Sequence, residues 1–285
     1  MPEITPHTQV CALFGHPVGH SLSPALHNAA FDALKLPFVY VAHDVAPAQL
    51  TAAMGGVRAL GYRGLSVTIP HKVAALSLVD ECDTTARSIG CINTVVIEGS
   101  KLIGYNSDGL GALGALRAAG AEPEGGKVVV LGSGGAARAL AITLAVETPP
   151  ADLLIASPDA GERQRLLHDV AALGTTAVRH APLEPERLKA ELADASLLLQ
   201  CSPVGMHPDV QASLVDPAWL QQRTTVFDAV YNPRETRLLR DARAAGCRVV
   251  SGLEMFLGQA MVQFELWTGR TAPADVMRRT LEERL

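Results

Sequence analysis

The sequence predicts a two-domain α/β protein in which one domain is a Rossmann-like dinucleotide-binding domain. Strand and helix patterns alternate along the chain, and a glycine-rich turn follows a short apolar strand near its middle. A length of 285 residues also corresponds to about two domains. We expect a first α/β domain over residues 1–109, completed by residues 253–285, and a dinucleotide-binding domain over residues 110–252.

The first domain is expected to alternate between strands and helices, which predicts an open, mostly parallel sheet. The expected strands are Val10–Phe14, Phe38–His43, Leu65–Ile69, Thr94–Ile97 and Leu102–Gly104. Their apolar, often β-branched residues are typical of buried strands. The expected helices are Pro24–Leu34, Pro47–Leu60 and His71–Val79.

The second domain is expected to follow a helix at Leu110–Ala119 and a polar linker at Ala119–Gly126. Its expected strands are Val128–Leu131, Leu153–Ala156, Leu197–Gln200, Val226–Ala229 and Arg248–Val250. Beyond them, one apolar stripe with helical spacing comprises Leu253, Phe256, Leu257, Ala260, Met261, Phe264 and Trp267. Because the second sheet is complete without this helix and the next one from Ala274, we expect both to return to the first domain.

The turn after Val128–Leu131 carries a dinucleotide-binding fingerprint. Gly132, Gly134 and Ala137 match the pattern G-x-G-x-x-G/A within the segment KVVVLGSGGAAR. The first glycine permits the tight turn, the second lets a pyrophosphate approach the backbone, and the small third residue lets helix and strand pack closely. N–H groups at the start of the helix then bind the phosphates.

Composition narrows the class of protein. Hydrophobic residues make up 48% of the chain and charged residues 19%, which is typical of a globular protein, and a net charge of −5 gives no support for nucleic-acid binding. No apolar run is long enough for a membrane span, and no signal pattern opens the chain. The five cysteines are scattered and no metal-ligand spacing is present, so we expect a cytoplasmic protein without a metal site.

Several polar residues of the first domain are candidates for substrate chemistry. Ser21 and Ser23 precede Pro24, where hydroxyls could either cap a helix or bind a carboxylate. Lys72 follows a strand that ends before Pro70, at the sheet edge where α/β proteins bind ligands, although most lysines are simply solvated. Asn93 and Asp108 could also bind substrate, although Asn and Asp in such turns often hydrogen bond only to their own backbone.

Taken together, these motifs resemble the shikimate dehydrogenase family, including its quinate/shikimate relatives. The resemblance covers nearly the whole chain. It rests on the segments FGHPVGHSLSPALHN, VTIPHK, INT, YNSDG, GSGGAAR, CSPVGM, DAVYNPRETRLL and GLEMFLGQA. Their order and spacing make this a specific match.

The resemblance implies reversible reduction of 3-dehydroshikimate to shikimate by NADP or NAD, in aromatic amino-acid biosynthesis. It implies Lys72 and Asp108 as catalytic residues and leaves open which of them moves the proton. The substrate-binding residues it implies are Ser21, Ser23, Thr68, Asn93, Tyr231 and Gln259. The cofactor-binding residues it implies are Gly132, Gly134, Gly135, Ala136, Ala137, Arg138, Ser157, Asp159 and Gly252.

Two positions depart from the family pattern. Ser66 stands where many members have asparagine in N-V-T-x-P, a change from which we expect little effect. NADP-dependent members usually read Asn-Arg-Thr where this chain has Ser157, Pro158 and Asp159. Asp159 lies 22 residues after Ala137, close to the spacing of an acid that binds the ribose of NAD. NAD and NADP therefore stay open, with a preference for NAD, since Arg138 and Arg163 could still reach a 2′-phosphate.

Other functions are compatible with the sequence. Quinate or an amino-substituted shikimate could be the main substrate, although retention of both serines favours shikimate. A non-catalytic ligand sensor could use the same fold, but the presence of Lys72 and Asp108 argues against it. We expect small-molecule ligands and neither nucleic-acid nor membrane partners. A homodimer is compatible with the sequence.

Overall fold

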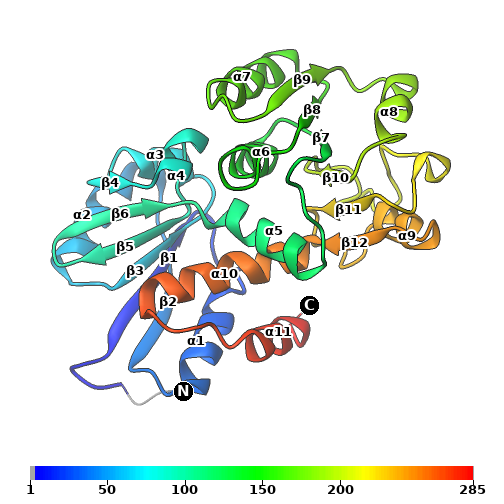
Figure 1. Ribbon diagram of the computed structural model, residues 1–285. Coiled ribbons are helices and arrows are strands. Elements are labelled where there is room, and N and C mark those ends of the chain that lie inside the picture. The colour runs from blue at the N-terminus through cyan, green and yellow to red at the C-terminus, as the bar shows by residue number, and fades with distance from the viewer. Residues whose placement is uncertain (1–3, 285) are drawn as a thin grey trace. The chain divides into compact units, whose positions relative to one another are not determined.

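The computed structural model describes residues 4–284, which form two compact units (Figure 1). Unit 1 contains the chain up to Ser107 and from Gln259 onward, and unit 2 is Asp108–Gly258. The sequence placed these boundaries after residues 109 and 252. The second boundary lies later because helix α10 (Gly252–Thr268) is continuous, so its first turns belong to unit 2 and the rest to unit 1.

Unit 1 is built on a six-stranded sheet with the order β2-β1-β3-β5-β6-β4. Its strands are β1 (Gln9–Gly15), β2 (Phe38–Asp44), β3 (Gly64–Val67), β4 (Glu81–Cys82), β5 (Thr94–Glu98) and β6 (Lys101–Tyr105). Its helices, besides the end of α10, are α1 (Ser23–Ala33), the short η1 (Pro47–Gln49), α2 (Leu50–Ala59), α3 (Lys72–Leu76), α4 (Thr84–Ile89) and α11 (Ala274–Glu282).

This sheet is mostly parallel, as expected, with β4 also pairing parallel to β6, but the expectation did not include the antiparallel pairings of β5. Strands β1, β2 and β3 are parallel, whereas β5 pairs antiparallel with both β3 and β6. The cause is local: Glu98 pairs with Lys101, so only Gly99 and Ser100 connect β5 to β6, and so short a link permits only an antiparallel hairpin. Gly99 has a φ of 61°, which suits glycine in such a turn.

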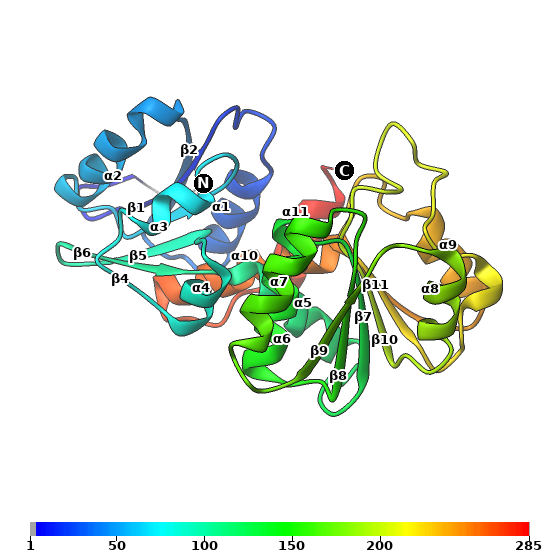
Figure 2. The same ribbon diagram turned by 90° about the horizontal axis from the view of Figure 1, so that it is seen from above.

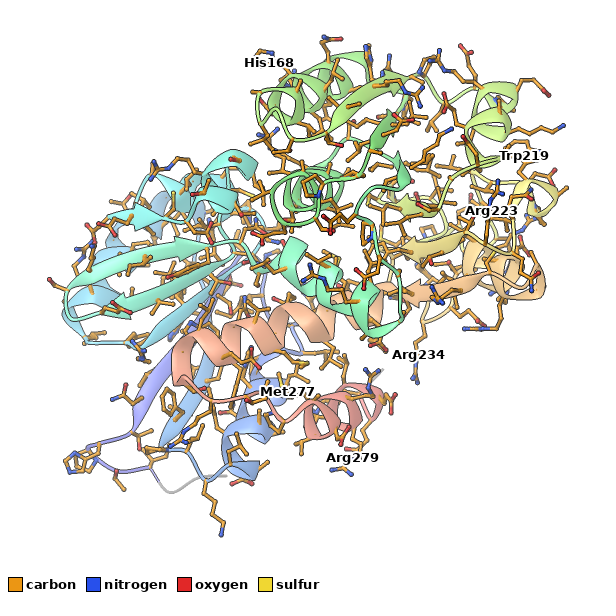
Figure 3. The ribbon with its side chains drawn as sticks, viewed as in Figure 1. His168, Trp219, Arg223, Arg234, Met277 and Arg279 are labelled. Atoms are coloured by element: carbon orange, nitrogen blue, oxygen red, sulfur yellow. The ribbon has the colours of Figure 1, made fainter. Side chains whose placement is uncertain are left out.

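The last two helices complete unit 1. Trp267 of α10 is 1% exposed, and its ring lies over β3 so closely that a Cβ on Gly64 would come within 2.2 Å of it. Its indole N–H donates to the carbonyl of Val95 at 3.1 Å. Helix α11 lies against α1, and Met277, labelled on α11 in Figure 3, is fully buried.

Unit 2 is a doubly wound parallel sheet with the order β12-β11-β10-β7-β8-β9, as the fingerprint predicted. Its strands are β7 (Lys127–Leu131), β8 (Asp152–Ala156), β9 (Ala177–Ala181), β10 (Leu197–Gln200), β11 (Thr225–Asp228) and β12 (Arg248–Ser251). Its helices are α5 (Ser107–Ala118, from Asp108 onward), α6 (Gly135–Glu147), α7 (Ala160–Ala171), α8 (Pro185–Leu192), η2 (Pro217–Trp219) and α9 (Arg237–Ala244).

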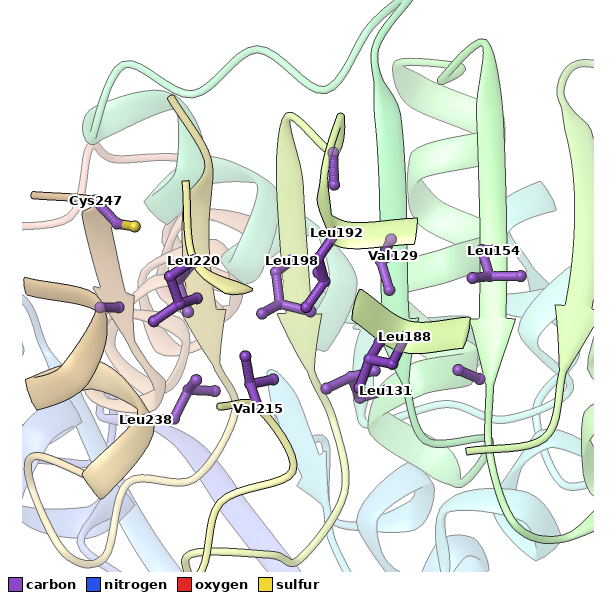
Figure 4. Packing of buried hydrophobic residues seen from close by; sticks show 14 of the residues in the cluster. Val129, Leu131, Leu154, Leu188, Leu192, Leu198, Val215, Leu220, Leu238 and Cys247 are labelled. Atoms are coloured by element: carbon purple, nitrogen blue, oxygen red, sulfur yellow. The ribbon is translucent and has the colours of Figure 1, made fainter. Parts of the chain in front are cut away.

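Helices cover both faces of this second sheet. Helices α6 and α7 lie on one face, and α8 and α9 lie on the other (Figure 2). In Figure 4, Leu188 and Leu192 of α8 pack over Val129 and Leu198 of the central strands. Burial on both faces explains why strands such as β7 are continuously apolar rather than alternating. Among residues 4–284, no helix has the length and hydropathy that crossing a bilayer requires.

Candidate active site

The topology of unit 1 brings several chain segments to one edge of its sheet. The parallel strands β1 and β3 end there at Gly15 and Val67. Because β5 runs antiparallel to β3, its first residue, Thr94, lies opposite Ser66 at the same edge. Strand β6 runs antiparallel to β5 and ends there at Tyr105, opposite Thr94. Most residues that the sequence singled out in unit 1 follow or precede these strand ends.

Ser21 and Ser23 stand at the start of α1. The sequence placed Ser23 just before the helix, but Ser23 is its first residue and Leu22 is the N-cap residue. The Ser21 hydroxyl accepts a hydrogen bond from the backbone N–H of Ser23 at 3.2 Å, although the N-cap residue itself provides no side-chain cap. Ser23 is 7% exposed. The positive end of the helix dipole and two hydroxyls therefore occupy one place, which suits a carboxylate.

Thr68 and Lys72 lie on the turn that follows β3. The backbone N–H of Thr68 donates to Phe14 at 2.9 Å, which joins the turn to β1. Lys72 is the first residue of α3, and its carbonyl accepts from the N–H of Ile92 at 3.0 Å, next to Asn93. The buried ring of His71 hydrogen bonds through Nε2 to the carbonyl of Val45 at 2.7 Å, which holds this turn from a second side.

Asn93 lies between Lys72 and the end of β6. Its backbone carbonyl accepts from Val67 at 2.8 Å, and its N–H donates to Tyr105 at 3.0 Å. Its side-chain Oδ1 accepts from the N–H of Ser107 at 2.8 Å and from the hydroxyl of Thr94 at 2.7 Å. Asn93 is 2% exposed, so its amide is held in one orientation.

Asp108 follows Ser107 directly and is the first residue of unit 2. It lies in the first turn of α5, where a carboxylate interacts favourably with the helix dipole. The next residue, Gly109, lies so close to α6 that a Cβ would come within 1.9 Å of Thr143 Oγ1. This close approach fixes Asp108 relative to α6, the helix that opens with the dinucleotide fingerprint.

The fingerprint loop fits a dinucleotide. Gly132 has a φ of 116°, and a Cβ there would meet the backbone of Cys201 at 3.0 Å, so protein packing alone requires this glycine. In contrast, a Cβ on Gly134 or Gly135 would meet no atom within 4 Å. These two glycines leave open space at the N-terminus of α6, where a pyrophosphate would lie. Ala136 and Arg138 follow in the first turns of α6, and Ala137 is fully buried, as close packing on β7 demands.

The end of β8, where a ribose would be recognised, carries acidic groups. Asp159 caps α7, since its Oδ1 accepts from the N–H of Glu162 at 2.8 Å. Ser133 of the loop hydrogen bonds to Ser157 at 2.7 Å, and its hydroxyl donates to Glu162 at 3.2 Å. Two carboxylates thus stand at this strand end.

The two arginines that could reach a phosphate there bind other groups. Arg138 forms an ion pair with Asp169 at 2.6 Å. Arg163 is 8% exposed and donates to the carbonyl of Ser157 and to His180.

The remaining candidates lie at the end of β11 and along α10. Tyr231 is 47% exposed, and its ring lies 5.9 Å from that of Phe256. Gly252 begins α10 and must lack a side chain, because a Cβ would come within 2.5 Å of the Ala229 carbonyl. Tyr231 and Gly252 belong to unit 2, whereas Gln259 is the first residue of α10 in unit 1.

Sequence reasoning did not single out four buried residues of unit 1 that join one hydrogen-bond network: Tyr40, Thr94, Ser107 and Gln263. Gln263 lies four residues after Gln259, which places both on one helix face, and this spacing could have revealed it. Ser107 lies inside the motif YNSDG, in which only Asp108 was named as a candidate. Within the described residues, no group of three or more His, Cys, Asp or Glu side chains could hold a metal ion.

Comparisons with known proteins agree with this architecture. Residues 13–95 match the shikimate dehydrogenase substrate binding domain, and residues 252–282 match the shikimate 5'-dehydrogenase C-terminal domain. The shikimate dehydrogenase (NADP(+)) of Moorella thermoacetica is 44% identical over 99% of this chain and 96% of its own.

Two solved structures are similar over almost their entire length. Shikimate 5-dehydrogenase from Listeria monocytogenes, in complex with shikimate and NAD, has a TM-score of 0.94 and 32% identity, with 98% of each chain covered. The 5-ketofructose reductase of Gluconobacter sp. strain CHM43 has a TM-score of 0.89 and 31% identity, with 99% of this chain and 100% of that chain covered. Full-length identity above 40% to a curated relative, together with the two domain matches, shows that this chain belongs to the shikimate dehydrogenase family.

Proposed function

We propose that this protein is an NAD(P)-dependent oxidoreductase that reversibly reduces 3-dehydroshikimate to shikimate in the biosynthesis of aromatic amino acids. The observation that carries the proposal is the placement of Lys72 at the sheet edge that also carries Ser21, Ser23 and Asn93. One edge thus offers a cation, a carboxylate site and an amide. The dinucleotide loop of unit 2 supports the same reaction class.

Substrate binding follows from the chemistry of each group. The start of α1, with Ser21 and Ser23, binds the shikimate carboxylate through hydroxyl and backbone N–H donors. Asn93 and Thr68 hydrogen bond to ring hydroxyls, and Tyr231 and Gln259 complete the set of polar contacts. All these groups are neutral, so the ligand's negative charge is balanced by the helix dipole and by Lys72.

The chemical step needs a proton donor for the C3 oxygen. The bound dinucleotide would supply a hydride to C3. The Lys72 ammonium stabilises the negative charge that develops on the oxygen and delivers a proton to it, so that the carbonyl becomes a hydroxyl. Asp108, the second catalytic residue that the resemblance implies, accepts a hydrogen bond from a neighbouring substrate hydroxyl.

For the cofactor, we propose a preference for NAD over NADP. Asp159 and Glu162 stand where a 2′-phosphate would be recognised, and their charges would repel it. Arg138 and Arg163 are engaged with Asp169 and Ser157. The Moorella relative carries NADP(+) in its name, so the assays below measure both cofactors.

The test is a matrix of steady-state assays that follow nicotinamide absorbance. The purified protein is assayed with NAD⁺ or NADP⁺ against shikimate and quinate, and with NADH or NADPH against 5-ketofructose. We expect the highest kcat/KM for shikimate with NAD⁺. Higher kcat/KM for quinate or 5-ketofructose would overturn the substrate assignment. Higher kcat/KM with NADP⁺ would overturn only the cofactor preference.

A further inference from the structure

The buried interior of unit 1 contains a chain of polar side chains that ends at Asn93. Its members are Tyr40, Ser66, Gln263, Thr94, Ser107 and Asn93, each between 0% and 4% exposed. They come from β2, β3, α10, β5 and the segments beside it, all within unit 1. Buried polar groups require partners, and here most of the partners are one another.

The hydrogen bonds among these side chains all donate in one direction, from Tyr40 towards Asn93. The Tyr40 hydroxyl donates to Ser66 at 2.7 Å, and the Ser66 hydroxyl donates to Gln263 Oε1 at 3.0 Å. Gln263 Nε2 then donates to the Thr94 hydroxyl at 3.0 Å. The Thr94 hydroxyl donates in turn to Asn93 Oδ1 at 2.7 Å. The Thr94 hydroxyl also lies 3.2 Å from the Ser107 hydroxyl oxygen as a donor, and the Ser107 hydroxyl donates to the same Asn93 Oδ1.

A backbone group fixes the orientation of the Gln263 amide. Its Nε2 also faces the Asn93 carbonyl oxygen at 3.3 Å, and a carbonyl can only accept. The atom facing it must therefore be the nitrogen, which leaves Oε1 to accept from Ser66. If the amide were reversed, Thr94 would have to donate its proton to Gln263 and could no longer donate to Asn93.

The orientation of Asn93 is set first by Ser107, whose backbone N–H can only donate and meets Asn93 Oδ1 at 2.8 Å, and Thr94, held as a donor by Gln263, adds a hydrogen bond to the same oxygen. Asn93 Oδ1 accepts from Thr94 and from the N–H and hydroxyl of Ser107, the latter at 3.1 Å. With its oxygen committed inside the protein, the edge that Asn93 can offer a ligand is Nδ2, a donor. We propose that Gln263 is a positioning residue: by donating to Thr94 it keeps that hydroxyl a donor to Asn93 Oδ1, and so works with Ser107 to hold Asn93 with its Nδ2 as the donor to a hydroxyl oxygen of the substrate.

Gln263 also accounts for the departure at Ser66. Where many family members have asparagine in the strand, this chain has a shorter hydroxyl residue, and the amide beside it comes from α10. Burial lowers the pKa of the neighbouring His27 to about 3, and its ring stacks 4.5 Å from that of Tyr40. The His27 ring is therefore neutral and adds no charge beside the hydrogen-bonded side chains. The positioning role rests on the proposed function, because it assumes that Asn93 binds the substrate.

The experiment compares Gln263→Leu, which keeps the volume but removes the amide, with the unmodified protein. We expect the shikimate KM to rise about 3- to 10-fold, the loss of one oriented hydrogen bond, while the cofactor KM stays unchanged. Combined with Asn93→Ala, the variant should add no further increase, because both changes remove one interaction. Independent, multiplying effects on KM would overturn the positioning role.

Matched variants separate positioning from folding. Trp267→Phe removes the bond from the next turn of α10 to β5, so we expect it to lower the Tm but to leave the shikimate KM unchanged. Thr94→Val should raise the shikimate KM as Gln263→Leu does, whereas Thr94→Ser, which keeps the hydroxyl, should not. This pair tests the same hydrogen bonds if Gln263→Leu does not fold. Equal KM values for Thr94→Val and Thr94→Ser would contradict the proposal.

A readout without activity distinguishes this inference from the proposed function. The side-chain amide signal of Asn93 in NMR spectra, assigned by its loss in Asn93→Asp, should shift in Gln263→Leu and not in Trp267→Phe. An unmodified protein without shikimate turnover would refute the proposed function alone. An unshifted Asn93 amide signal would refute the role of Gln263, whatever the substrate.

Discussion

Replacing Ser21 should affect both the stability of unit 1 and the affinity for shikimate. Its hydroxyl accepts from the Ser23 N–H at 3.2 Å in the first turn of α1. Loss of this bond in Ser21→Ala costs about 1 kcal/mol of the free energy of unfolding, or about 2–4 °C in Tm. The same hydroxyl is proposed to donate to the substrate carboxylate, and a hydrogen bond to a charged group is worth about 1.5–3 kcal/mol. The shikimate KM should therefore rise about 10- to 150-fold.

The Ser23 variant separates these two effects. In Ser23→Ala the backbone N–H that donates to Ser21 is retained, so this hydrogen bond persists and the change should act mainly on shikimate binding. Ser21→Thr keeps a hydroxyl at the position and serves as the matched control. The assay measures KM by steady-state kinetics and Tm by thermal unfolding. A Ser21→Ala protein with a lowered Tm but an unchanged shikimate KM would show that the carboxylate binds elsewhere.

Three further substitutions test other parts of the account. Gly64→Ala should lower the free energy of unfolding by about 1–3 kcal/mol in denaturant titrations, because its Cβ would lie within 2.2 Å of the Trp267 ring; unchanged stability would refute this packing. Asp159→Ser keeps a capping oxygen for α7 and removes a charge, so kcat/KM with NADP⁺ should rise relative to NAD⁺; an unchanged ratio would exclude Asp159 from cofactor choice. Burial raises the pKa of Asp228 from 3.8 to about 6, so its stabilising contribution is complete below pH 3.8 and is lost as the pH rises through 6. Asp228→Asn should therefore flatten the decrease in stability between pH 4 and pH 7, and an identical pH profile would contradict this.

Much of the fold could be predicted because the signals were local. The run Val128–Leu131 followed by Gly132 defines a strand and a turn within a few residues, and the parallel sheet of unit 2 follows from repeated strand–helix alternation. Strand β9 was missed because its sequence AVRHA mixes apolar and charged residues at the sheet edge. Strand β5 was expected, but its antiparallel pairing depends on the two-residue link that follows it.

The candidate site was harder to predict where it depends on side chains meeting across elements. Ser21 and Asn93 belong to motifs that can be read along the chain. In contrast, the contacts of Gln263 with Ser66 and Thr94 join residues 197 and 169 positions apart. No local pattern reveals such a pairing, since it depends on how α10 packs against β3 and β5. The start of α1 was also placed one residue late, because the helix begins at Ser23 rather than at Pro24.

The central claim is that Lys72 performs the chemical step at a site whose other residues bind the substrate. The most direct test is to measure shikimate binding by calorimetry and turnover with NAD⁺ and NADP⁺ on one preparation of Lys72→Ala. The account predicts that shikimate still binds while kcat falls about 100-fold or more, since the proton donor and the charge beside the reacting oxygen are gone. Turnover close to that of the unmodified protein would remove Lys72 from the mechanism and contradict the account.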